Sequence, residues 1–242
     1  QDTPGIIFNV NGQVIPASAE AAVNTDRGVT LASPNGQVLS LVEHFLSACG
    51  MLKVLDWPYG LQITVEGGPE LPILDGSALG WIEALRPLQP ENYQAKPAIN
   101  LTAPVYYSDT HATCVALPNE SGLSIQYAID FDHPDLKNRW LDLKCFEENP
   151  QANLIESIAP ARTFGFMREL PELQARGLAK GVSYDNTLGL NDDGSYTAEL
   201  RFPDECLRHK MLDFIGDMTL CRIPLSRMNA QFILVCAGHT SH

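Results

Sequence analysis

The sequence has 242 residues, of which 45% are hydrophobic and 19% are charged, so it holds enough apolar side chains for a packed core and is neither disordered nor a disulfide-stapled miniprotein. Its 29 acidic and 16 basic residues give a formal net charge of −13, which argues against nucleic acid or an anionic membrane surface as a partner of the whole molecule. The six cysteines are scattered without a Cys-x-x-Cys pair, and no apolar run approaches the roughly 20 residues of a spanning helix, so we expect a cytoplasmic protein with reduced thiols.

The first half of the sequence combines strand and helix patterns. Segments rich in β-branched residues predict a hairpin over residues 5–15, a strand that ends in a polar loop over residues 20–34, and a strand over residues 61–66. A helix is predicted from Leu39 to Leu52, because its apolar residues share one face, and Gly50 is interpreted as its terminator. Residues 69–76 predict a loop, and Ala78 to Leu85 a second helix.

The second half repeats this organisation after a linker. Residues 86–97 contain three prolines and several polar residues, which is typical of a linker. Alternating patterns then predict strands over residues 99–107, 111–117, 122–131 and 232–237, and helices over residues 150–158 and 205–220. The sequence therefore predicts an α+β fold with two domains of similar design, residues 1–90 and 98–242.

One predicted helix carries three polar residues at helical spacing. His209, Asp213 and Asp217 follow one another at intervals of four, so their side chains share one face. A histidine and a carboxylate placed in this way can bind one metal ion. The spacing alone favours the simpler interpretation, a capping histidine beside solvated acids, because short motifs often occur by chance.

Two histidines elsewhere complete a candidate site. His44 can supply a third metal ligand while its neighbour Glu43 acts as general base on a water, which is the arrangement of a catalytic zinc centre. His239 follows a predicted strand and can protonate a leaving amine while Asp217 keeps it charged. The alternatives are a surface glutamate beside a half-buried histidine, and an exposed histidine near the chain end.

Five motifs in a fixed order resemble one bacterial enzyme family. They are VEHFLSA (42–48), PILDGSA (72–78), ARTFGFMR (161–168), LRFPDE (200–205) and RHKMLD (208–213). Over nearly the whole chain, the sequence resembles the UDP-3-O-acyl-N-acetylglucosamine deacetylases, zinc amidases of lipid A biosynthesis. The resemblance implies two similar α+β domains packed face to face, with the active site between them.

The resemblance also implies roles for individual residues in hydrolysis of the N-acetyl group. It implies Zn²⁺ on His44, His209 and Asp213, although such ligands also suit Fe²⁺. Glu43 would be the base, His239 the acid, Asp217 the residue that orients His239, and Thr163 a group that polarises the amide carbonyl.

The implied substrate is a UDP-linked acylated amino sugar. Lys210 would meet its diphosphate or sugar, Phe131 would pack near the uracil, and Phe164 would lie against the glucosamine. An insert near residues 168–186 would line the passage for the acyl chain, with Leu170, Leu173, Ala179 and Val182. The alternatives are ordinary core aromatics and apolar residues that pack their own helix.

Three departures from the family leave other functions open. The sequence lacks the family's first strand and its glycine-rich loop of GVGLH type, residues 30–33 differ from the family's apolar loop, and GHTSH (238–242) replaces its GHALN ending. His242 is interpreted as a chain-end residue rather than an extra ligand. The open alternatives are a metal-dependent deacetylase for another N-acylated sugar, a noncatalytic homologue, and a fragment of a fused enzyme with a dehydratase domain. We expect a monomer, and the lipid-bearing substrate predicts peripheral contact with the inner membrane.

Overall fold

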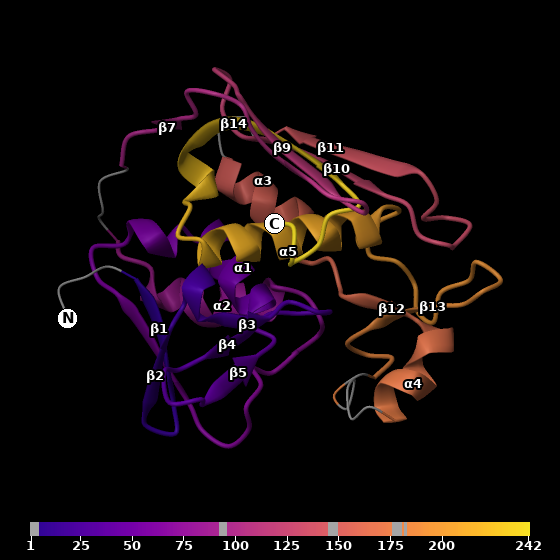
Figure 1. Ribbon diagram of the computed structural model, residues 1–242, viewed down its shortest axis with the longest axis horizontal. Coiled ribbons are helices and arrows are strands. Elements are labelled where there is room, and N and C mark those ends of the chain that lie inside the picture. Colours follow the sequence, from indigo (N-terminus) through magenta and orange to yellow (C-terminus); the bar gives the residue numbers. More distant parts are fainter. Residues whose placement is uncertain (1–4, 92–95, 145–149, 176–180, 182) are drawn as a thin grey trace.

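The computed structural model describes residues 5–91, 96–144, 150–175, 181 and 183–242. Its helices are α1 (Glu43–Met51), α2 (Leu79–Leu85), α3 (Pro150–Ser157), α4 (Leu170–Ala175) and α5 (Glu205–Leu220). Its strands are β1 (Ile6–Val10), β2 (Gln13–Pro16), β3 (Ala22–Asn24), β4 (Thr30–Ala32), β5 (Val38–Ser40), β6 (Leu61–Val65), β7 (Ile99–Asn100), β8 (Val105–Ser108), β9 (Thr113–Pro118), β10 (Ser124–Ile129), β11 (Arg139–Lys144), β12 (Phe164–Phe166), β13 (Leu188–Leu190) and β14 (Met228–Val235). Figure 1 shows a central layer of helices with strands on both sides, which confirms the expected α+β class.

The N-terminal part has two small sheets. In the first, β1 pairs antiparallel with β2 and parallel with β6. The predicted hairpin turn is confirmed, because Asn11 and Gly12 both adopt positive φ, 50° and 81°, as a tight two-residue turn requires. In the second sheet, β3, β4 and β5 are antiparallel neighbours, so the single strand predicted over residues 20–34 is in fact two.

Helix α1 begins later than the sequence pattern predicts. Leu41 has a φ of 60°, a left-handed conformation that a right-handed helix cannot include. The residues before it form β5 and pair with β4, so the helix begins at Glu43. Gly50 does not terminate the helix, which continues to Met51. Instead, Gly50 permits close packing of α1 against Thr219.

The C-terminal part has a larger sheet with the strand order β11-β10-β14-β9-β8, in which β7 also pairs with β14. Residues 99–107 form two short strands with different partners instead of one, because Pro104 lies between them without an amide hydrogen for a ladder. Strand β11 was not predicted, and β14 begins at Met228 rather than at residue 232. Helix α5 has the bounds predicted from the sequence.

Helix α5 lies between α1 and the larger sheet (Figure 1). Phe214 of α5 packs on Phe232 of β14, with ring centroids 5.2 Å apart. On the opposite side, a Cβ atom added to Gly216 would collide with the backbone carbonyl of Glu43, and one added to Gly50 would collide with Thr219 Oγ1. The two helices therefore touch through glycines, and this contact sets the distance between the two halves of the chain.

The described residues between 160 and 190 lie to one side of the layers (Figure 1). Strands β12 and β13 pair in parallel, and α4 lies beside them in Figure 1. The acyl-passage insert expected near residues 168–186 falls in this region, and the division at residues 1–90 and 98–242 stays a prediction. Among the described residues, no helix combines the length and the apolar character that crossing a membrane would require.

The glycine contact predicts a stability effect. The substitution Gly216→Ala should lower the free energy of unfolding by about 1–3 kcal/mol, because a methyl group at this position forces α5 away from α1. The control is Gly68→Ala, at an exposed position where an added Cβ atom would meet only the Glu70 amide nitrogen, at a relaxed 4.0 Å. Urea unfolding of both variants checks this, and equal stabilities would contradict the packing argument.

Candidate active site

Helices α1 and α5 bring two imidazoles and a carboxylate together. His44 comes from α1, and His209 and Asp213 lie one turn apart on α5. One ligand atom from each of the three lies within 4.8 Å of the others, and all three residues are buried. Burying such groups is costly unless they bind one another or a further group, so their meeting indicates a functional site.

The geometry and protonation of these residues fit a metal ion. Two ligands at about 2.0–2.1 Å from a tetrahedral zinc ion lie about 3.3–3.4 Å apart, and His209 Nε2 lies 3.4 Å from Asp213 Oδ1. His209 Nδ1 lies 3.1 Å from the carbonyl oxygen of Ala161, so it carries the proton and Nε2 keeps a lone pair. Burial and the neighbouring His209 lower the pKa of His44 to about 3, which keeps this imidazole neutral and able to ligate. Three ligands of this kind are typical of a catalytic rather than a structural centre.

Glu43 is held beside this cluster. Its Oε2 accepts a hydrogen bond from the Val29 amide at 3.0 Å, and Gly28, with a φ of 151°, allows the backbone to approach the carboxylate closely. Burial raises the pKa of Glu43 to about 7, despite the charge of His239 and the amide hydrogen bond, which act in the opposite direction. A carboxylate with this pKa can both accept and release a proton near neutral pH.

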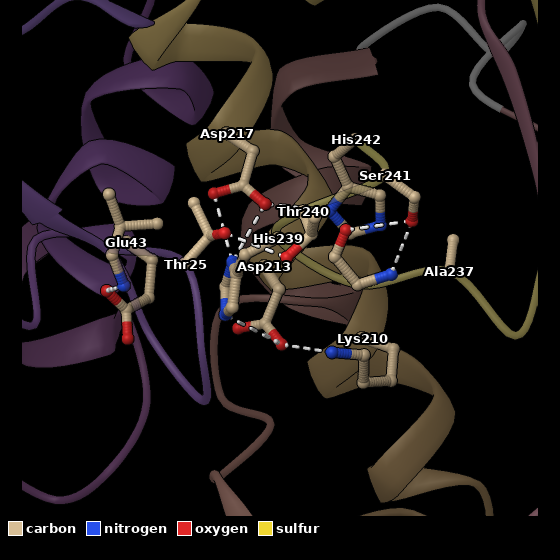
Figure 2. A network of polar contacts seen from close by, with 12 residues as sticks. Thr25, Glu43, Lys210, Asp213, Asp217, Ala237, His239, Thr240, Ser241 and His242 are labelled. Atoms are coloured by element: carbon tan, nitrogen blue, oxygen red, sulfur yellow. Dashed lines mark hydrogen bonds and ion pairs between the residues drawn. The ribbon is translucent and has the colours of Figure 1, made fainter. Parts of the chain in front are cut away.

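Asp217 and His239 form a pair beside Asp213 (Figure 2). His239 Nδ1 donates to Asp217 Oδ2 at 2.8 Å, and His239 Nε2 lies 3.9 Å from Asp213 Oδ2. Burial alone would lower the pKa of His239, but the carboxylates of Asp217 and Asp213 outweigh it and raise the pKa to about 9. The ring of His239 is therefore protonated near neutral pH, and its Nε2 lies near the candidate metal ligands.

Thr163 is held by two segments that are distant in sequence. Its amide donates to the Gly76 carbonyl at 2.8 Å, and its own carbonyl accepts from the Leu188 amide at 2.8 Å. Gly76 has a φ of 81°, and a Cβ atom there would collide with the backbone of Asn186. The DGSA and ARTFGF segments are thus packed together beside α5.

A buried ion pair joins the ARTFGF segment to α5. Arg162 donates from Nε to Glu205 Oε1 at 2.8 Å and from its amide to the same oxygen at 3.0 Å, and the Arg201 amide donates to Glu205 Oε2 at 2.7 Å. Because Glu205 lies one turn before His209, this pair holds the carbonyl of Ala161 where it accepts the hydrogen bond from His209 Nδ1.

The predicted substrate residues lie in different places. Phe164 lies 5.7 Å from Phe131 and 6.1 Å from His209, measured between ring centroids, and Lys210 Nζ donates to Asp213 Oδ2 at 2.8 Å. Leu170 and Leu173 are half-buried on α4. Ala179 and Val182 lie outside the described residues.

The whole chain, residues 1–242, matches the family of UDP-3-O-acyl N-acetylglycosamine deacetylases. The chain belongs to this family. It is 34% identical to the UDP-3-O-acyl-N-acetylglucosamine deacetylase of Thermodesulfovibrio yellowstonii, over 100% of this chain and 79% of that protein. It is 37% identical to the enzyme of the same name from Oleidesulfovibrio alaskensis, over 99% of this chain and 75% of that protein, and 34% identical to that of Nitratidesulfovibrio vulgaris, over 99% and 74%.

Membership in the deacetylase family confirms the resemblance drawn from the five motifs. Several groups that shape the site do not stand out in the sequence. The Val29 amide and the Ala161 carbonyl are backbone groups to which no side-chain pattern points. Arg162 and Glu205 stand inside the quoted motifs, and opposite charges in two such motifs were a signal that these motifs meet in space.

The ion pair predicts a large stability effect. The substitution Glu205→Ala should lower the free energy of unfolding by about 3–5 kcal/mol, because it leaves the Arg162 guanidinium and two amides buried without their acceptor. Asp192→Ala is a matched control, since it removes a short but exposed pair with Arg168 and should leave stability nearly unchanged. Chemical denaturation compares the two, and similar losses would show that burial is not decisive.

Proposed function

We propose that the protein is a metal-dependent amidase that removes the N-acetyl group of UDP-3-O-acyl-N-acetylglucosamine. The observation that carries this proposal is that two imidazoles and a carboxylate meet between α1 and α5, with Glu43 next to His44 on α1 and His239 Nε2 3.9 Å from Asp213 Oδ2. The names of the relatives from T. yellowstonii and O. alaskensis support the substrate.

His44, His209 and Asp213 would hold the metal ion. We propose Zn²⁺, and Fe²⁺ suits the same nitrogen and oxygen ligands. When bound, such an ion supplies Lewis acidity, which makes a water molecule more acidic and an amide carbonyl more electrophilic. The hydrogen bond between His209 Nδ1 and the Ala161 carbonyl orients one ligand for this purpose.

Glu43 and His239 would divide the proton transfers. Glu43 takes a proton from the water whose oxygen bonds to the acetyl carbon. His239 then gives its Nε2 proton to the amide nitrogen as the carbon–nitrogen bond breaks, which releases acetate and the free amine of the glucosamine. Asp217 holds His239 Nδ1, so that the nitrogen on the far side of the ring faces the substrate.

Thr163 would donate its hydroxyl proton to the oxygen that becomes negative as water adds to the carbonyl. Lys210 would contact the diphosphate or the sugar, Phe164 the glucosamine, and Phe131 the uracil. Phe164 packs edge-on against both Phe131 and His209, which supports a sugar and a base bound next to the candidate metal ligands. Leu170 and Leu173, together with Ala179 and Val182, would line the acyl passage.

The remaining expectations form part of the same proposal. A UDP-linked sugar as substrate fits a reaction in the cytoplasm, and its acyl chain fits a protein that touches the inner membrane without crossing it. We propose a monomer, because His44, His209 and Asp213 meet within a single chain.

The proposal predicts that metal binding and turnover can be separated by substitution. The purified protein should hold about one metal ion per chain and release acetate from UDP-3-O-acyl-N-acetylglucosamine. Glu43→Gln should keep the metal and lose about 10²–10⁴-fold in kcat, because the amide cannot accept the proton. His209→Ala should lose the metal together with activity.

Metal analysis and an acetate-release assay check these variants, and chelation followed by Zn²⁺ or Fe²⁺ reconstitution identifies the active ion. Bound metal without turnover in the unaltered protein would favour another N-acylated sugar. Absence of metal binding would contradict the mechanism and favour the noncatalytic homologue.

A second prediction concerns the Thr163 hydroxyl. Thr163→Val should lower kcat by about 10²–10³-fold, because it removes a donor to the oxyanion while keeping the shape of the side chain. Thr163→Ser retains the hydroxyl and should keep most of the activity. Steady-state kinetics compares the pair, and equal rates for valine and serine would remove Thr163 from the mechanism.

A further inference from the structure

The carboxylate of Asp217 is shared by two histidines. His239 Nδ1 lies 2.8 Å from Asp217 Oδ2, and His242 Nδ1 lies 2.7 Å from the same oxygen (Figure 2). A carboxylate that ionises at low pH accepts hydrogen bonds only, so each of these ring nitrogens donates a proton to it. His242 is thus bonded to the very group that holds the proposed acid.

His242 is itself held firmly. Its side chain is fully buried, and its ring packs edge-on against Phe214, with centroids 5.3 Å apart. Its second nitrogen, Nε2, lies 3.0 Å from the hydroxyl of Tyr127, which also lies 2.8 Å from the Ala237 carbonyl. Both nitrogens of this imidazole therefore have a partner, which is unlike a histidine placed by chance at a surface.

The backbone joins the two histidines in one tight turn. The amides of Ser241 and His242 both donate to the Gly238 carbonyl, at 2.9 and 3.0 Å. The Ser241 hydroxyl accepts from the Gly238 amide at 3.0 Å, and Thr240 bonds to Thr25 in the N-terminal part at 2.8 Å. Fixing the His242 ring thus fixes the turn from which His239 projects.

We propose that His242 is a positioning residue for the acid His239, which it serves by donating Nδ1–H to Asp217 and by anchoring the 238–242 turn. This inference rests on the proposed function, in which His239 protonates the leaving amine. Asp217 has two oxygens and can rotate, and a second donor at Oδ2 removes that freedom. His239 then keeps one orientation of its ring and presents Nε2 to the substrate. An acid that is already oriented lowers the activation barrier of the reaction. His242 contributes to this orientation and does not itself contact the substrate.

A second metal ion is the main rival explanation, because Asp217, His239 and His242 also bring one ligand atom each within 4.8 Å. The distances argue against it. The two nitrogens lie 2.7 and 2.8 Å from Asp217 Oδ2, which is shorter than the about 3.3 Å between two ligands of one tetrahedral zinc ion. His209 and Asp213 show the longer spacing, 3.4 Å, whereas the distances to Asp217 are those of hydrogen bonds.

Three substitutions in the 242-residue chain test the proposal. His242→Phe keeps a ring but removes both nitrogens, and should lower kcat by about 10- to 100-fold with KM within twofold and the metal content unchanged. His242→Asn restores one N–H donor and should recover most of that loss. Tyr127→Phe removes only the hydroxyl at Nε2 and should give a smaller loss, of about threefold.

Proton NMR provides a readout that does not depend on turnover. The unaltered protein should show two downfield imidazole N–H signals from the hydrogen bonds to Asp217. His242→Phe should abolish one and broaden the other, because His239 then loses its fixed orientation. Inactivity of the unaltered protein would count against the proposed function, and the two signals would still decide whether His242 and His239 share Asp217.

Several outcomes would overturn the proposal. Unchanged kcat in His242→Phe would mean that His242 only packs against its neighbours. Equal losses in the phenylalanine and asparagine variants, together with a lower melting temperature, would mean a role in folding. A second bound metal ion that disappears in His242→Phe would replace the hydrogen-bond explanation with a metal site.

Discussion

The contact between α1 and α5 is the constraint on which the site depends. It brings backbone against backbone, with a glycine on each helix where a side chain would separate them. Glu43 and His44 come from one helix, and His209, Asp213 and Asp217 from the other. Because the ligand atoms of His44, His209 and Asp213 lie within 4.8 Å of one another, even a small displacement of one helix along the other would separate Glu43 and His44 from the residues of α5.

This contact also buries an unusual concentration of ionisable groups. The structure satisfies most of them with specific partners: Lys210 on Asp213, two imidazoles on Asp217, and a backbone amide on Glu43. Burial and these partners set a different pKa for each group. Glu43 and His239 can each gain or lose a proton near neutral pH, while His44 remains neutral. Burial therefore provides the different proton affinities that acid–base chemistry needs.

Short patterns in the sequence predict the parts of the fold that depend mainly on neighbouring residues. The hairpin at Asn11-Gly12 and the bounds of α5 follow from turn and helix signals, and the motifs identified the family. The start of α1 could not be predicted, because the left-handed φ of Leu41 depends on pairing between β5 and β4. His242 was interpreted as a chain-end residue, because its partners Tyr127 and Asp217 are far away in the sequence and only the fold brings them close.

The position of α5 between α1 and the larger sheet has a consequence for how the molecule forms. Glu43 and His44 of α1 cannot meet His209, Asp213 and Asp217 of α5 until α1 docks on a helix that lies more than 150 residues later in the sequence. Contacts of such high sequence separation form slowly, since a long loop must close first. During synthesis on the ribosome, the face of α1 that contacts α5 therefore stays uncovered until α5 has been made. The site forms only when α5 packs against α1.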